Sequence, residues 1–161
     1  MIAYTPDYFQ SLAFDTDYQT LASYIVEIYH SKTVVEFGCG PGHLSRELAK
    51  LGVEVTAVDG FSRPDFTDLS VEFSPLDLNN TDAIAAFFAN KRFDLAVSLE
   101  VAEHLQPESS PTLVQWLTQV APVVVFSAAV PCQDGHGHIN LQPRDSVSYT
   151  HLRAHETEAD L

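Results

Sequence analysis

The residues best suited to chemistry in this chain are an acid and three glycines, Glu36, Gly38, Gly40 and Gly42, within TVVEFGCGPGHLS at residues 33–45. The β-branched residues before the acid predict a strand, and the run after the last glycine predicts a helix. Glycine has no Cβ, so such a turn can adopt positive φ and bring its backbone close to a ligand. The free N–H groups at the helix start attract anionic groups. We therefore expect a turn that binds a nucleotide-like ligand; a purely structural turn is the alternative.

Further acids follow other predicted strands. Asp59 ends the run VEVTAVD, Asp77 stands in SPLDLNN after a third strand, and Glu100 follows FDLAVSL. The carboxyl ends of parallel strands lie at one edge of a sheet, where ligands bind. We therefore expect these three acids and Glu36 to line one rim, although each could instead be a helix cap or a turn residue.

Histidines supply the candidate proton-transfer groups. Glu100 and His104 are four residues apart in a predicted helical turn over residues 100–105, so they would share one helical face. His104 could act as a general base, or it could cap a helix or brace a loop. His136 and His138 stand in the glycine-containing loop QDGHGHINLQP, without an evident carboxylate ligand. This pattern favours ordinary loop residues, and no metal site is expected.

Strands and helices alternate along the chain. The expected strands cover residues 33–37, 53–59, 71–73, 93–99 and 122–128. The expected helices cover residues 17–30, 43–51, 81–90 and 111–119. Near-continuous apolar strands such as VVVF are covered on both faces. The sequence therefore predicts an α/β fold with a doubly wound, mostly parallel sheet.

Length and composition limit the classes of protein and partner that fit this chain. A chain of 161 residues is typical of one domain. The formal charge of −14, from 22 acidic and 8 basic residues, argues against a nucleic-acid partner. No apolar run is long enough to span a membrane. Cys39 and Cys132 lack the C-x-x-C spacing of zinc sites, and no disulfide is expected, which fits a reducing cytoplasm.

The segment E-x-G-x-G-x-G, residues 36–42, resembles motif I of the class I S-adenosylmethionine-dependent methyltransferases, and the resemblance extends over most of residues 20–145. It implies that the glycine turn wraps the methionine end of S-adenosylmethionine, with Glu36 near the ammonium group. It also implies that Asp59 accepts hydrogen bonds from the ribose hydroxyls. Asp77 and Leu78 would contact the adenine.

The segment FDLAVSLEVAEHL, residues 93–105, is similar to the fourth-strand motif of the small-molecule branch of this family. The similarity implies that Glu100 and His104 flank the transferred methyl group or a small-molecule acceptor, with His138 a more distant candidate for acid–base chemistry. The expected reaction is direct displacement at the sulfonium methyl. Family members often fold an N-terminal segment over the cofactor, a role open to the aromatic residues here; packing on the sheet is the alternative. These residues are Tyr4, Tyr8, Phe9 and Phe14.

Two other functions compete with this one. A nicotinamide-dependent oxidoreductase uses G-x-G-x-x-G, whereas the third glycine here comes one residue early. Glu36 just before the turn is also of less use to a pyrophosphate. The second competitor is a cofactor-binding module that does not catalyse a reaction.

The C-terminal residues are interpreted separately. VSYTHLRAHET, within residues 146–161, looks like a translated sequencing adaptor, so we expect a methyltransferase domain over residues 1–145 and a non-native tail. A genuine polar C-terminal helix is the alternative. The family fold usually has seven strands, and five are found. The sheet is therefore expected to lack its last strands, which would leave PVVVFSA as an exposed apolar edge.

Overall fold

The computed structural model describes residues 4, 7–10, 16–67, 69–143 and 145. Their centre is a five-stranded parallel sheet with strand order β3-β2-β1-β4-β5. The strands are β1 (Thr33–Phe37), β2 (Glu54–Asp59), β3 (Val71–Pro75), β4 (Leu95–Leu99) and β5 (Val123–Ser127). This confirms the predicted fold class. All five expected strands begin and end within two residues of the observed bounds, and the third extends two residues beyond its expected end, to Pro75.

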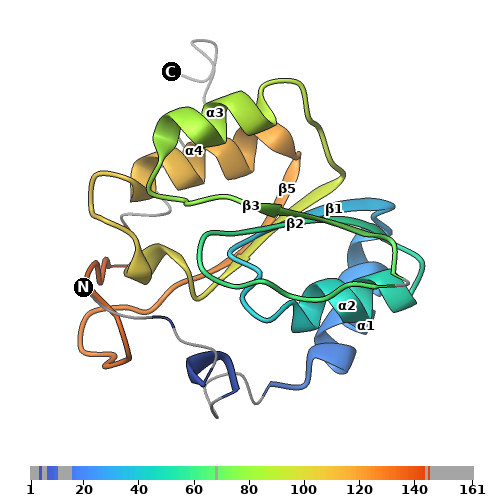
Figure 1. Ribbon diagram of the computed structural model, residues 1–161, viewed down its shortest axis with the longest axis horizontal. Coiled ribbons are helices and arrows are strands. Elements are labelled where there is room, and N and C mark those ends of the chain that lie inside the picture. Colours follow the sequence, from blue (N-terminus) through green and yellow to red (C-terminus); the bar gives the residue numbers. More distant parts are fainter. Residues whose placement is uncertain (1–3, 5–6, 11–15, 68, 144, 146–161) are drawn as a thin grey trace.

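Two helices cover each face of the sheet (Figure 1). On one face lie α1 (Tyr18–Tyr29) and α2 (His43–Lys50), and on the other lie α3 (Thr81–Phe88) and α4 (Ser110–Val120). Successive strand residues serve opposite faces, as the period of a strand requires. Val34 packs in the core with α1 and α2, whereas Val35 packs in the core with α3 and α4, and both are fully buried. Burial on both faces explains the continuous apolar runs of the central strands.

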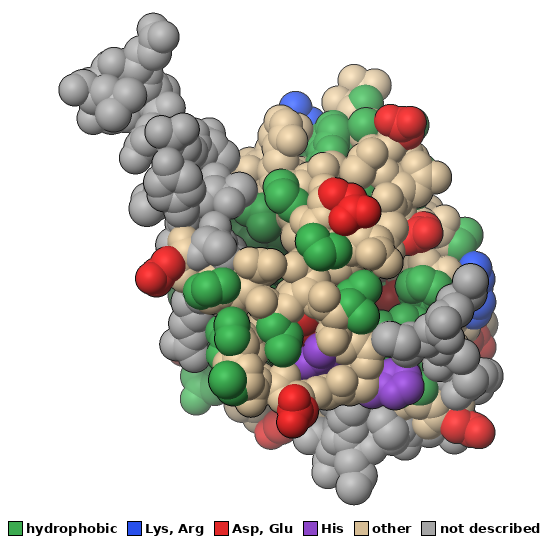
Figure 2. All heavy atoms as spheres, turned by 90° about the vertical axis from the view of Figure 1, so that its left-hand side faces the viewer, with side chains coloured by type: hydrophobic (Ala, Val, Ile, Leu, Met, Phe, Trp, Pro, Cys, Tyr) green, Lys and Arg blue, Asp and Glu red, His purple; other side chains and the backbone are tan. Residues whose placement is uncertain are grey.

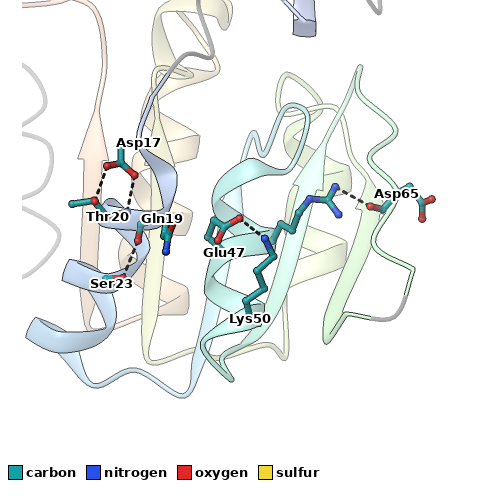
Figure 3. A network of polar contacts seen from close by, with 8 residues as sticks. Asp17, Gln19, Thr20, Ser23, Glu47, Lys50 and Asp65 are labelled. Atoms are coloured by element: carbon teal, nitrogen blue, oxygen red, sulfur yellow. Dashed lines mark hydrogen bonds and ion pairs between the residues drawn. The ribbon is translucent and has the colours of Figure 1, made fainter.

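Side-chain hydrogen bonds cap the first turns of α1 and α3. Asp17 caps α1 by accepting hydrogen bonds from the Thr20 backbone N–H at 3.0 Å and the Thr20 hydroxyl at 2.7 Å (Figure 3). Asn80 caps α3 in the same way, through the N–H of Ala83 at 3.1 Å. In both caps a side-chain oxygen satisfies an N–H that the helix leaves unpaired.

The strand order reverses direction beside β1, and this reversal positions the site. After β1 the chain builds β2 and β3 on one side, and then returns to place β4 and β5 on the other. The loops that follow β1 and β4 therefore diverge and leave a crevice at the carboxyl ends of the strands. Two short 3-10 helices, η1 (Tyr8–Gln10) and η3 (Ala102–His104), lie at this end of the sheet.

No helix within the described ranges combines the length and the apolar character needed to cross a bilayer. The tail predicted at residues 146–161 lies outside the described residues, so that interpretation stays a prediction.

Candidate active site

A cavity of about 630 Å³ occupies the crevice at the carboxyl ends of the strands. Nearly all the site residues expected from the sequence line it, although they come from four different strand ends. They are Glu36, Gly38, Gly40, Asp59, Asp77, Leu78, Glu100 and His104. The remaining one, Gly42, is not a wall residue. A Cβ on Gly42 would lie 2.4 Å from Cζ of Phe66, so this glycine makes room for an aromatic ring at the start of α2.

Glycine favours the backbone conformation at two further positions of the turn after β1. Gly38 has φ +76° and Gly40 has φ +52°, both in the left-handed region. A Cβ on Gly38 would lie 2.5 Å from a methyl carbon of Val101, in the loop after β4. The turn is fixed to β2 because the N–H groups of Gly38 and Cys39 donate to the carbonyl of Val58, at 2.8 and 3.1 Å. Two neighbouring strand ends are thus held in close contact.

Asp59 shapes this turn as well as facing the cavity. Its Oδ2 accepts the N–H of Gly40 at 2.9 Å, and its Oδ1 accepts the N–H groups of Phe61 and Ser62 at 2.8 and 2.7 Å. A carboxylate has about four lone-pair positions, so these three bonds leave roughly one position, on Oδ2. The family resemblance implied that Asp59 accepts hydrogen bonds from the ribose hydroxyls. The structure shows an acid that is largely engaged by the backbone around it.

Glu36 is a buried carboxyl on β1 without a basic partner among the described residues. The Ser45 hydroxyl on α2 donates to its Oε2. Burial raises the pKa of Glu36 to about 7, and the nearby charge of Asp59 acts in the same direction. A buried acid of this kind favours a cation brought by a ligand, because the attraction is strong where water is excluded.

Asp77 and Leu78 form the far side of the same half of the cavity. Asp77 is exposed and accepts the N–H of Asn79 at 2.9 Å, whereas Leu78 is buried. The chain approaches closely here, since a Cβ on Gly60 would lie 3.1 Å from Cα of Asp77. An apolar side chain beside an exposed carboxylate suits a flat heterocycle with amino groups at its edge.

Glu100 and His104 line the opposite half, but they do not share a helical face. The expected helical turn over residues 100–105 is wrong in extent, because η3 contains only residues 102–104 and Glu100 has φ +54°. Glu100 is held instead by β5, since the Ser127 hydroxyl donates to its Oε1 at 2.7 Å. Nδ1 of His104 lies 3.2 Å from the carbonyl oxygen of Gly137 and 3.0 Å from the Tyr4 hydroxyl. Burial lowers the pKa of His104, which favours the neutral form of the ring.

Glu103 is the residue that sequence reasoning missed. It is fully buried; its Oε1 accepts the N–H of Ala129 at 3.1 Å, and its Oε2 has no hydrogen-bond partner within the described part of the chain. Burial raises the pKa of Glu103 to about 7, and the neighbouring Glu100 carboxylate contributes. The available signal was the second acid of E-x-x-E-H, which the spacing argument for Glu100 and His104 passed over.

The loop after β5 brings a second histidine to this acid. Ile139 and Asn140 donate their N–H groups to the backbone carbonyl of Glu103 at 2.9 and 3.0 Å. One ligand atom from each of Glu103, His104 and His138 then lies within 4.8 Å of the others. Figure 2 shows histidine side chains reaching the surface beside acidic ones on this face. The expectation that His138 has no carboxylate nearby is therefore wrong, because Glu103 comes from a different loop.

Aromatic residues from the N-terminal segment form the outer wall of the cavity. Tyr4, Tyr8 and Phe9 all line it. The Tyr4 ring lies 4.9 Å from that of Phe61, and the Tyr8 ring lies 4.7 Å from that of His136. These rings join the loops after β2 and β5 across the opening. Phe14, also expected in this cover, lies outside the described residues.

Known proteins match this fold and motif set. A family model described as a methyltransferase domain matches residues 14–156, and the chain belongs to that family. Among curated relatives, a ubiquinone biosynthesis O-methyltransferase of Cereibacter sphaeroides is 40% identical over 75 residues, which are 45% of this chain and 30% of the relative. A trans-aconitate 2-methyltransferase of Mycobacterium tuberculosis is 32% identical over 108 residues, 66% of this chain and 40% of the relative. The chain thus spans between 30% and 40% of the length of these two relatives.

Solved structures show the same fold at low sequence identity. An S-adenosylmethionine-dependent methyltransferase from Archaeoglobus fulgidus superposes with a TM-score of 0.66 at 16% identity, covering 96% of this chain and 76% of that one. The N-terminal domain of EvdMO1 with S-adenosylhomocysteine bound gives a TM-score of 0.65 at 16% identity, covering 86% of this chain and 71% of that one.

Proposed function

We propose that this chain binds S-adenosylmethionine in the cavity and transfers its methyl group to an oxygen atom of a small molecule. The observation that carries the proposal is the buried Glu36 carboxyl, which has no basic partner among the described residues and lies beside a glycine turn at the start of α2. The methionine end of the cofactor carries an ammonium and a carboxylate. Glu36 suits the first, and the N–H groups at the start of α2 suit the second.

Residues at the ends of the next two strands, β2 and β3, suit the ribose and the adenine of the cofactor. The open lone-pair position on Oδ2 of Asp59 is available to one ribose hydroxyl, and Asp77 with Leu78 suits the adenine amino group and ring. A nicotinamide dinucleotide fits less well, because its pyrophosphate would stand near two carboxyls, Glu36 and Asp59. The proposed cofactor is positive at the corresponding end, and opposite charges attract strongly in a half-enclosed site.

The acceptor takes the other half of the cavity, where Glu100 and His104 act on it. The acceptor hydroxyl gives its proton to His104, and its oxygen attacks the methyl carbon. The bond between that carbon and sulfur breaks, and its electron pair stays on sulfur to give the neutral thioether. Most of the acceleration comes from alignment of oxygen, carbon and sulfur, which can supply about 7–11 kcal/mol. Oxygen is favoured because curated relatives include an enzyme named as an O-methyltransferase.

Titration calorimetry with S-adenosylmethionine, S-adenosylhomocysteine and NAD⁺ tests the cofactor. We expect saturable 1:1 binding of the first two and none of NAD⁺. Binding of NAD⁺ alone would overturn the proposal and favour the oxidoreductase. Binding of S-adenosylmethionine without transfer to any hydroxylated acceptor in an extended protein would favour a binding module that does not catalyse.

A further inference from the structure

We propose that Glu103, His104 and His138 bind a divalent transition-metal ion in the acceptor half of the cavity. One carboxylate oxygen and one nitrogen of each imidazole lie within 4.8 Å of one another. Two imidazoles and a carboxylate form a ligand set typical of Zn²⁺, Fe²⁺, Co²⁺ and Mn²⁺, and three protein ligands leave positions open for a small molecule.

The unpartnered oxygen of Glu103 is the independent sign of a ligand. Glu103 is fully buried, and its Oε2 receives no hydrogen bond from the described residues. A second carboxylate, that of Glu100, lies close enough to act on it electrostatically. Two neighbouring carboxyls repel each other when both are ionised, and either a shared proton or a cation relieves that repulsion. The two imidazoles beside Glu103 favour the cation, because they add neutral nitrogen ligands where a shared proton would need none.

Both histidines are held in the manner of metal ligands. Nδ1 of His104 lies 3.2 Å from the carbonyl oxygen of Gly137, and Nδ1 of His138 lies 3.0 Å from that of Gln133. A ring that donates from Nδ1 to a carbonyl carries its lone pair on Nε2, where it can bind a metal ion. Two rings fixed this way, 5.0 Å apart between centroids, form a preorganised pair.

The loop makes room for His138 at a specific place. A Cβ on Gly135 would lie 2.2 Å from Cε1 and 2.3 Å from Nε2 of that ring. Any other residue at position 135 would displace the imidazole. Gly135 therefore leaves space for the imidazole of His138, although the φ of this residue does not require glycine.

The role of the ion rests on the proposed function. His104 and His138 line the cavity beside Glu100, opposite the proposed cofactor residues. An ion there can bind the acceptor oxygen and lower its pKa, with the proton released to water, before that oxygen attacks the methyl carbon. His104 then acts as a ligand and no longer as a free base. Acceptors with two adjacent oxygen atoms are favoured, because they can bind the ion through both.

The test is a titration of the tag-free, chelator-treated chain with Co²⁺ and Zn²⁺ alone. We expect one tight site, a visible cobalt absorption band typical of low coordination number, and loss of that band when Zn²⁺ is added. Glu103→Gln and His138→Gln should each weaken binding by at least about tenfold. His136→Ala is the matched control, because His136 lines the same cavity from the same loop but is not in the cluster; its binding should be unchanged.

The outcomes separate this inference from the proposed function. If no saturable site appears, or if all variants bind equally, the metal proposal fails and a proton shared by Glu100 and Glu103 is the better account. Circular dichroism checks whether Glu103→Gln folds. If it does not fold, His138→Gln still tests the proposal, because His138 is only half-buried. S-adenosylmethionine binding is measured on the same metal-free samples. Cofactor binding without metal binding overturns the inference alone, and metal binding without cofactor binding overturns the proposed function.

Discussion

The backbone N–H of Gly40 donates to Oδ2 of Asp59 at 2.9 Å, so one carboxylate joins the turn after β1 to the end of β2. The same carboxylate also accepts the N–H groups of Phe61 and Ser62. Shape and recognition in the cofactor half therefore depend on one buried acid. A change at Asp59 affects the turn itself in addition to the single acceptor position left for a ligand.

Asp59→Ala should reduce both cofactor affinity and stability. Loss of a charge-assisted hydrogen bond predicts roughly 10- to 100-fold weaker S-adenosylmethionine binding, at about 1.4 kcal/mol per factor of ten. Three backbone N–H groups also lose their acceptor, which should lower the free energy of unfolding by about 2 kcal/mol or more. Calorimetry and urea denaturation measure the two effects. Asp65→Ala, an exposed acid in the following loop, is the control. Unchanged affinity in Asp59→Ala would refute its assignment to the cofactor.

Glu36→Gln should change how stability depends on pH. The folded chain raises the pKa of this carboxyl from 4.5 to about 7, so it binds more protons than the unfolded chain between those values. Stability therefore falls as the pH rises through this window, by up to about 3 kcal/mol. The variant lacks this contribution and should be more stable than the parent above pH 7. Denaturation curves of both proteins from pH 5 to 8 isolate the effect, because their other titrating groups are the same.

The same substitution should weaken cofactor binding while it stabilises the free protein. Ionised Glu36 attracts the ammonium of the cofactor, so the parent's affinity should rise between pH 5.5 and 7.5, as about one charge is gained. The affinity of Glu36→Gln should change less over that range. If the cofactor affinities of the two proteins changed with pH in the same way, Glu36 would not contact the ammonium.

Gly38→Ala should be much more damaging than the same change at Gly52. Both glycines have positive φ, +76° and +86°, so both substitutions carry a backbone cost of roughly 1–2 kcal/mol. A Cβ at Gly38 also meets Val101 at 2.5 Å, whereas a Cβ at Gly52 meets nothing within 4 Å. We expect Gly38→Ala to lose an additional 1–3 kcal/mol, a range typical of overpacking by about one methyl group, together with cofactor binding. Equal melting temperatures for the two variants would contradict the close contact between the turn and Val101.

The fold could be predicted because its signals are local. The runs TVVEF and VVVF, the caps Asp17 and Asn80, and the alternation of strands with amphipathic helices all agree with one architecture. The acids that follow the strands could be assigned in advance to one rim of the sheet, because parallel strands place their carboxyl ends at one edge. The strand ends were less certain because tertiary pairing extends β3 to Pro75, against the usual preference of proline.

The residues that line the cavity on the β1–β3 side could be named from the sequence, whereas on the β4–β5 side the sequence named Glu100, His104 and His138 but missed Glu103. Glu36, Gly38 and Asp59 stand at motif positions whose chemistry can be read without a structure. Glu103 and His138 are 35 residues apart, and their proximity depends on how the loop after β5 folds back onto η3. The sequence likewise did not reveal that Glu100 lies outside η3. Its backbone is left-handed, and its side chain is bonded to Ser127, which is distant in the sequence.

The reversal of strand order beside β1 has a consequence for engineering. Everything proposed to hold the donor comes from the β1–β2–β3 side, and everything proposed to meet the acceptor comes from the β4–β5 side. Segments after residue 93 can therefore be exchanged with those of relatives while the donor half is retained, so long as Val101 or an equivalent side chain still fits against Gly38. Chimaeras joined at residue 93 would give a library in which the methyl donor is constant and the acceptor varies.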